Sequence, residues 1–171
     1  MSVRILLADD HRMFRDGLRA LLAAQTDLEV VGEAEDGLTA LELAMKLRPD
    51  IVILDLAMPR LHGIEVVRRL TADLPQTRII VLTMHSDRRF VIEALRSGAA
   101  AYVLKESGFA VLAEVIEDVR AGRLYLSPAV AEQVIRDYVR LAEAEAGSAL
   151  AVLSGREREV MQLIAGGRST K

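Results

Sequence analysis

The sequence contains no cysteine and no tryptophan, and aromatic residues make up only 4% of its 171 residues. The absence of cysteine excludes disulfides and thiolate metal sites. Because aromatics are scarce, aliphatic side chains must build the core, and a hydrophobic content of 51% is enough for that. No stretch approaches the roughly 18 apolar residues of a membrane span, and the apolar run at residues 5–8 is too short for a signal peptide. The sequence therefore predicts a cytoplasmic protein with no membrane partner.

The chain also lacks a strong excess of either positive or negative charge, since its acidic and basic residues nearly balance at a net charge of −3. This balance excludes a chain whose whole surface binds nucleic acid, although it leaves room for a small basic module. The composition likewise excludes disordered and collagen-like chains. With 171 residues, the chain exceeds one typical domain and falls short of two.

Five short apolar runs rich in Ile, Val and Leu alternate with segments of helical periodicity. The runs cover residues 4–8, 28–33, 51–56, 78–84 and 101–104. They lack polar alternation, which is typical of strands that are covered on both faces in a parallel sheet. Five βα units predict an α/β fold, and right-handed crossovers favour the flavodoxin-like strand order 2-1-3-4-5.

Beyond the fifth unit the pattern changes. Residues 123–127 predict a short extended piece, and a helical pattern that Pro128 opens is interrupted at Gly147 and Ser148. A last segment with capping-box spacing starts at Ser154. We therefore expect one domain at 1–122, a partly helical linker at 123–149 and the start of a second, helical domain at 150–171.

Polar residues stand at the ends of the strands that border the switch point of this order. They are Asp9 and Asp10 after the first strand, Asp55 in the third, Thr83 in the fourth and Lys105 after the fifth. Open α/β sheets bind ligands outside the carboxyl ends of their strands, so we expect these five side chains to converge on one crevice. An aspartate after a strand is ordinarily a turn former or a helix cap. Such local roles would have to arise separately at all five of these positions, whereas a single shared site accounts for all of them together.

Carboxylates that lie close together repel one another unless one is protonated or a cation lies among them. Carboxylate oxygens at an open, partly hydrated site suit Mg²⁺. A carboxylate beside Mg²⁺ can attack a phosphoryl group in line while the metal neutralises the developing charge. The hydroxyl of Thr83 and the ammonium of Lys105 can hold the other phosphoryl oxygens. The constellation therefore predicts phosphoryl transfer to an aspartate, with Asp55 as the acceptor.

Two other functions use a similar sheet and fit the sequence less well. An aspartate-nucleophile phosphohydrolase needs a second acid two residues after the nucleophile, and that position holds Ala57. A nucleotide or flavin module needs a glycine-rich first turn that admits phosphates. Here that turn begins with Asp9 and Asp10, which repel phosphate in the absence of a metal.

Four motifs at the strand ends carry a family resemblance. They are Asp9-Asp10-His11, Asp55-Leu56-Ala57-Met58-Pro59 with Gly63, Val81-Leu82-Thr83, and the segment 98–105 that ends in Lys105. Over residues 1–122 the chain resembles the receiver domain of bacterial two-component response regulators. The resemblance implies that Asp55 accepts phosphate from a sensor histidine kinase. It also implies that Asp9, Asp10 and Asp55 bind Mg²⁺ together with the backbone carbonyl of Ala57.

The same resemblance implies a conformational switch. Thr83 would move toward the phosphoryl group and Tyr102 would turn inward behind it, which would change a surface that mediates dimerisation in many relatives. We therefore expect a homodimer when the protein is phosphorylated. Ala57 and His85 occupy positions that vary within the family, and we expect them to tune the phosphate lifetime. His85 would shield or orient the attacking water, and the alternative is an exposed histidine with no such role.

The end of the chain resembles the LuxR-type helix-turn-helix of the NarL/FixJ group. Residues 153–160 and 163–171 match its opening, and residues 124–128 are also typical of that group. This implies a phosphoacceptor that assists its own modification, not a turnover enzyme, and a parent protein that binds promoter DNA. The recognition helix comes later in such a domain, so we expect this chain not to bind a specific DNA site. A receiver that acts by protein contacts alone is the alternative function.

Overall fold

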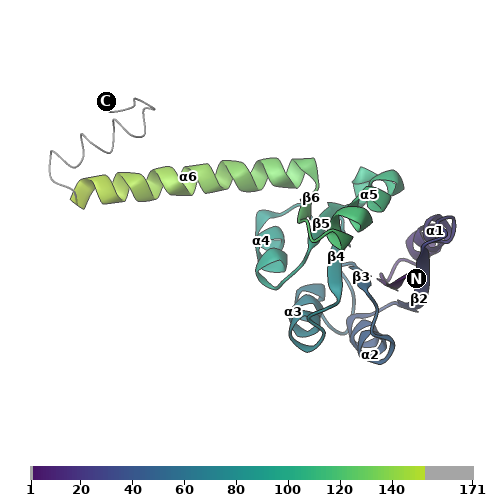
Figure 1. Cartoon of the computed structure of the whole chain (residues 1–171). Helices are drawn as coiled ribbons and strands as arrows, with labels where there is room; N and C mark the ends of the chain where they lie inside the picture. Colours follow the sequence, from purple (N-terminus) through teal and green to yellow (C-terminus); the bar gives the residue numbers. More distant parts are fainter. Residues whose placement is uncertain (1, 153–171) are drawn as a thin grey trace. The chain divides into compact units, whose positions relative to one another are not determined.

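The computed structural model describes residues 2–152 and shows a parallel sheet with helices on both faces (Figure 1). The strands are β1 (Val3–Ala8), β2 (Leu28–Ala34), β3 (Ile51–Leu54), β4 (Arg78–Thr83), β5 (Ala101–Leu104) and β6 (Tyr125–Leu126). Their order is β2-β1-β3-β4-β5-β6. The predicted order of the first five strands is confirmed, and the short piece after the fifth unit adds a sixth strand beside β5.

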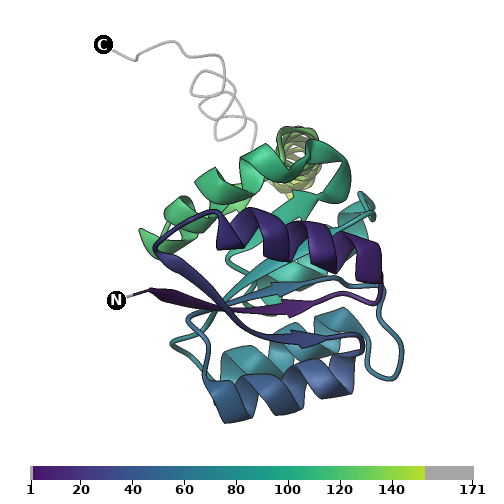
Figure 2. The same cartoon turned by 90° about the vertical axis from the view of Figure 1, so that its right-hand side faces the viewer.

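Within residues 2–152, six α-helices and one short 3₁₀ helix connect and follow the strands. They are α1 (Arg12–Ala23), α2 (Gly37–Leu47), α3 (Gly63–Asp73), α4 (Arg88–Arg96), the 3₁₀ helix η1 (Lys105–Ser107), α5 (Phe109–Arg120) and α6 (Pro128–Val152). Helices α1 and α5 cover one face of the sheet, and α2, α3 and α4 cover the other (Figures 1 and 2). Among the described residues, no helix is both long and apolar enough to span a bilayer.

Aliphatic side chains on both faces of the central strands form the core. On the α1 and α5 side, Leu7 and Ile53 pack in one cluster with Leu18 of α1 and Ile116 of α5. Val52, which alternates with Ile51 and Ile53 along β3 and so faces the other side of the sheet, is also fully buried. Because both faces are covered, the strands need apolar residues at successive positions, and this explains why their sequence does not alternate.

Helix α6 differs from the sequence-based expectation. The predicted interruption at Gly147 and Ser148 is wrong, because α6 runs without a break to Val152. A glycine inside a helix costs only about 1 kcal/mol relative to alanine, and the neighbouring Ala, Glu and Leu residues favour helix. The first compact unit of the chain is Met1–Val130 and a second begins at Ala131. The predicted helix-turn-helix segment at 150–171 lies, from residue 153 on, outside the described residues.

The loop between β3 and α3 is held close to the end of the sheet. The backbone N–H of Gly63 donates to the carbonyl of Leu56 at 3.1 Å. A Cβ atom at Gly63 would lie 2.5 Å from Leu56 Cα and 2.7 Å from the carbonyl oxygen of Asp55. Only glycine therefore lets α3 begin directly against the residues that follow β3, and this contact fixes the backbone that carries Asp55.

Gly63→Ala places a methyl group in that contact. We expect the free energy of unfolding to fall by about 3 kcal/mol, because the added atom overpacks a backbone contact that cannot yield. Gly122→Ala is the control, since its positive φ of 76° is strained but a Cβ there meets no atom within 4 Å. The control should lose only about 1 kcal/mol. Chemical denaturation of both variants measures the difference, and equal losses would contradict the steric explanation.

Candidate functional site

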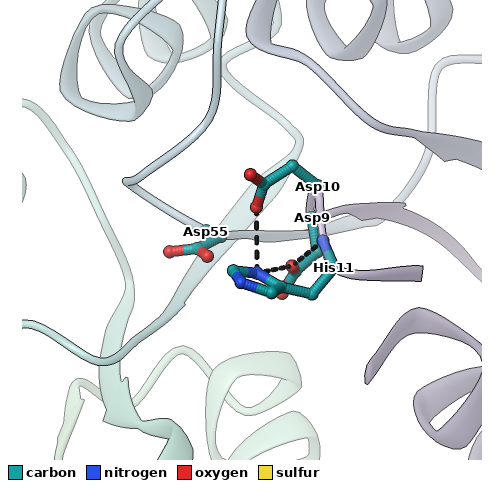
Figure 3. Close-up of side chains that lie close together, drawn as sticks. All are labelled: Asp9, Asp10, His11 and Asp55. Carbon is teal, nitrogen blue, oxygen red and sulfur yellow. Dashed lines mark hydrogen bonds and ion pairs between the residues drawn. The ribbon is translucent and has the colours of Figure 1, made fainter. Parts of the chain in front are cut away.

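Three carboxylates meet at the carboxyl edge of the sheet. Residues Ala8 of β1 and Leu54 of β3 are paired, so Asp9 and Asp55, which follow them, lie side by side. Asp10 comes next in the chain, and Figure 3 shows the three carboxylates around the ring of His11. One ligand atom from each of these four residues lies within 4.8 Å of the others. The structure thus brings together the three acidic residues that the sequence placed at this edge.

Lys105 bridges two of the carboxylates. Its ammonium lies 2.6 Å from Oδ2 of Asp9 and 2.7 Å from Oδ2 of Asp55. Only 6% of the Lys105 side chain is exposed. Lys105 directly follows β5, and the position agrees with the prediction that a cation would enter from that strand end.

Burial and charge act on Lys105 in opposite directions. Removing the ammonium from water would lower its pKa, while the hydrogen bonds and charges of Asp55 and Asp9 raise it, and the net effect is a raised pKa. The charged form of Lys105 is therefore the one that the site stabilises. The ammonium neutralises part of the negative charge that the three carboxylates bring together.

Backbone donors hold the remaining oxygens of the two buried aspartates. Oδ1 of Asp55 accepts the N–H of Ala57 at 3.2 Å, and Oδ1 of Asp9 accepts the N–H of His11 at 2.8 Å. On the other side of Asp9, its backbone carbonyl accepts a hydrogen bond from Arg15 Nη1 of α1 at 2.5 Å. The carboxylates are thus oriented by the loops that carry them before any ligand binds.

His11 is a member of the cluster that the sequence analysis treated only as part of a motif. Its Nδ1 lies 3.0 Å from Oδ1 of Asp10 and 3.2 Å from Oδ1 of Asp9 (Figure 3). His11 is also the residue before the first turn of α1. The available signal was its position directly after two aspartates, because the start of a helix turns the chain back toward the preceding side chains.

Thr83 and Tyr102 lie at neighbouring strand ends. Thr83, the last residue of β4, is fully buried, and its Oγ1 accepts the backbone N–H of His85 at 3.3 Å. Tyr102 of β5 is also fully buried and its hydroxyl donates to the carbonyl of His85 at 2.7 Å. The β4–α4 loop is therefore held by both residues. The structure has Tyr102 in the inward position, and the ring of His85 rests against Phe90 with 5.1 Å between ring centroids.

The position of Tyr102 shifts its acidity. Burial raises the pKa of its phenol above the ordinary value, and the charges of Asp55 and Asp87 raise it further. Ionisation of Tyr102 is therefore opposed by the same carboxylate that forms the centre of the site. The phenol stays a hydrogen-bond donor throughout the neutral pH range.

The donor set fits a hard divalent cation. Three carboxylates face one ammonium, which leaves two negative charges to be balanced. Oxygen ligands at a partly exposed edge are those that Mg²⁺ prefers. Asp10, whose side chain is 35% exposed, keeps the cluster open to water and ions.

The parallel sheet with an acidic cluster at its carboxyl edge is the architecture of a receiver fold. The family described as "Response regulator receiver domain" matches residues 5–117. The chain therefore belongs to the response regulator family. This confirms the resemblance that the strand-end motifs indicated.

The relatives narrow this assignment. "Transcriptional regulatory protein DegU" of Brevibacillus brevis is 35% identical over 99% of this chain and 78% of its own length. A crystal structure of a LuxR-family two-component response regulator from Aurantimonas sp. SI85-9A1 is 37% identical, with a TM-score of 0.77 over 81% of this chain and 99% of that chain. A structure of two RcsB dimers bound to two parallel DNAs is 26% identical, with a TM-score of 0.71 over 98% of this chain and 78% of that chain. The protein is thus a LuxR-type two-component response regulator that controls transcription, and members of this type are not classic enzymes.

Tyr102→Phe removes the buried hydroxyl and keeps the ring. At about pH 8 we expect the free energy of unfolding to fall by about 1 kcal/mol, because the carbonyl of His85 loses its donor. The raised pKa of Tyr102 contributes stability below pH 10, and this contribution is lost as the pH rises above 10. Since phenylalanine has no proton to lose, the difference between the two proteins should shrink above pH 10.

Urea unfolding at about pH 8 and about pH 10.5 measures both differences. Loss of the Lys105 proton occurs in both proteins and cancels in the comparison. A difference that stays constant between the two pH values would show that burial does not hold Tyr102 in its neutral form.

Proposed function

We propose that Asp55 is the residue that accepts a phosphoryl group from a sensor histidine kinase. The observation that carries the proposal is the bridge of Lys105 between Asp9 and Asp55, with Asp10 completing the carboxylate cluster. Of the three carboxylates, Asp55 is the one that follows β3, which lies directly beside β4, whereas Asp9 and Asp10 follow β1, which lies between β2 and β3. Donors from β4 and β5 can therefore reach a group bound to it.

Asp9, Asp10 and Asp55 would hold Mg²⁺ together with the backbone carbonyl of Ala57. When bound, the ion would neutralise charge on the phosphoryl oxygens during transfer. The chain's own residues supply the rest of the site. Lys105 offers a second positive charge at Oδ2 of Asp55, and Thr83 offers a hydroxyl at the end of the adjacent strand β4.

The transfer forms one bond and breaks one bond. A carboxylate oxygen of Asp55 attacks phosphorus while the P–N bond of the kinase phosphohistidine breaks, and its electron pair returns to the imidazole nitrogen. Asp55 then gives up one of its hydrogen-bond acceptors, so Lys105 and the N–H of Ala57 can turn to the new phosphoryl oxygens. In the hydrolysis step, water attacks phosphorus, the Asp55 carboxylate leaves, and Asp55 returns to its unmodified form. The protein thus assists both steps and is restored at the end of the cycle.

The switch would pass through the β4–α4 loop. Thr83 contacts the backbone N–H of His85 and Tyr102 contacts the carbonyl of the same residue. If Thr83 turns to a phosphoryl oxygen, it gives up its contact with the N–H of His85, and the loop shifts around Tyr102, which already points inward. The surface of α4, β5 and α5 would change with it and promote a homodimer.

The remaining partners follow from the relatives. In its solved structure, RcsB forms dimers that are bound to DNA, and the structural match extends over 98% of this chain. We extend both partners, a second copy and promoter DNA, to the parent protein, with residues 150–171 as the start of its helix-turn-helix and 123–149 as the linker after a receiver at 1–122. A kinase that draws on ATP would place the phosphoryl transfer in the cytoplasm.

Incubation with Mg²⁺ and acetyl phosphate tests the acceptor directly. We expect a single acyl phosphate on Asp55, labile in both acid and base, that mass spectrometry locates, and no phosphate in Asp55→Ala or in the presence of a chelator. Asp73→Ala, which removes an exposed aspartate at the end of α3, is the matched control and should be modified like the wild type. Equal yield from Asp55→Ala would refute the assignment.

His85→Ala tests the predicted role in phosphate lifetime. We expect hydrolysis of the phosphate on Asp55 to become about threefold faster, which corresponds to roughly 0.7 kcal/mol in activation free energy, because the ring that shields the attacking water is lost. The ring of Phe90 contacts both His85 and His62. His62→Ala therefore serves as the control and should leave the lifetime unchanged. An unaltered lifetime in His85→Ala would mean that His85 is simply an exposed side chain.

A further inference from the structure

An aromatic side chain lies against the cation of the acidic site. The Nζ atom of Lys105 is 4.5 Å from the ring centroid of Phe14, which belongs to α1. Phe14 is not a core residue in the ordinary sense, because it is only half-buried and borders an open apolar hollow with Met13 and Phe109. Its ring therefore gives the ammonium a third neighbour besides Asp9 and Asp55.

This contact is suited to hold a lysine in place. A lysine side chain has a long flexible stem, and its two carboxylate contacts engage only the ammonium at the end of that stem. The negative face of an aromatic ring attracts an ammonium, and the attraction is stronger where water is excluded. The side chain of Lys105 is almost fully buried, so its contact with Phe14 is of the strong, desolvated kind.

The fold fixes the ring of Phe14 from behind. Phe109, the first residue of α5, packs on Phe14 with 5.2 Å between ring centroids. Gly17 makes room for this packing, since a Cβ atom there would lie 3.2 Å from the ring of Phe109. Two helices that are far apart in the sequence, α1 and α5, thus together place one aromatic face beside the ammonium.

We propose that Phe14 is a positioning residue for phosphoryl transfer, which holds the ammonium of Lys105 at the acidic site through a cation–π contact. The proposal rests on the proposed phosphorylation of Asp55. During transfer, Lys105 exchanges the Asp55 carboxylate for phosphoryl oxygens, while its contact with Phe14 is unaffected. Phe14 acts through Lys105 and does not touch the phosphoryl group.

Two substitutions separate this role from packing. Phe14→Leu keeps an apolar side chain and removes the aromatic face, whereas Phe14→Tyr keeps the face. With Mg²⁺ and acetyl phosphate, we expect phosphorylation of the full chain to slow by about tenfold in Phe14→Leu and to stay near the wild-type rate in Phe14→Tyr. Met13→Leu is the matched control, because Met13 borders the same hollow and is 87% exposed. Its rate should not change.

A second measurement is independent of phosphorylation. The chain has only three lysines, Lys46, Lys105 and Lys171, so ¹⁵N-lysine NMR resolves their ammonium signals and Lys105→Met assigns the one at the site. The wild-type Lys105 signal should carry a ring-current shift that Phe14→Leu removes and Phe14→Tyr retains. Unfolding midpoints of the two variants should agree, which controls for a general loss of stability.

The outcomes are distinct. An equal slowing in Phe14→Leu and Phe14→Tyr, or a Lys105 signal that does not respond to Phe14→Leu, would overturn the positioning role. If the ring-current shift behaves as expected but the wild type takes up no phosphate on Asp55, the proposed acceptor and the positioning role in transfer both fail, and only the contact stands. If Asp55 is phosphorylated at the same rate in all variants, the acceptor stands and the role of Phe14 is refuted.

Discussion

The ammonium of Lys105 is the charge on which the geometry of the site depends. Two buried carboxylates, Asp9 and Asp55, would repel one another at neighbouring strand ends if no cation lay between them. Lys105 contacts both at hydrogen-bond distance and is itself almost completely buried. A buried charge is costly unless it is paired, so the lysine and the two aspartates stabilise each other in place. The site is thus assembled by electrostatics while the sheet supplies the framework.

The sheet itself follows from a simple property of the sequence. Strands that are buried on both faces need apolar residues at successive positions, and a polar residue directly follows β1, β3 and β5. In a parallel sheet all of these ends lie at one edge, and for this reason Asp9, Asp55, Thr83 and Lys105 could be placed together from sequence alone. The structure confirms the strand order, and it brings Asp9, Asp10, Asp55 and Lys105 into direct proximity.

Other features were beyond sequence reasoning because they depend on weak or nonlocal effects. The continuous helix through Gly147 reflects a balance between the cost of one glycine and the favourable propensity of its neighbours, and pattern reading gave the glycine too much weight. His11 joins the cluster through the turn at the start of α1. The contact between Phe14 and Lys105 joins residues that are far apart in the chain, and no spacing rule predicts it.

In the proposed switch, the hydrogen bonds of the β4–α4 loop would carry a change at Asp55 to the surface. Thr83 and Tyr102 come from different strands, yet both contact the backbone of His85. A displacement of that one residue therefore alters two buried side chains at once, and a tightly packed interior does not absorb such a change gradually. Two discrete arrangements of the loop are more consistent with this packing than a continuous range. In the proposed switch, the acidic site and the loop would therefore respond together, with the charge balance around Lys105 at the centre of the site.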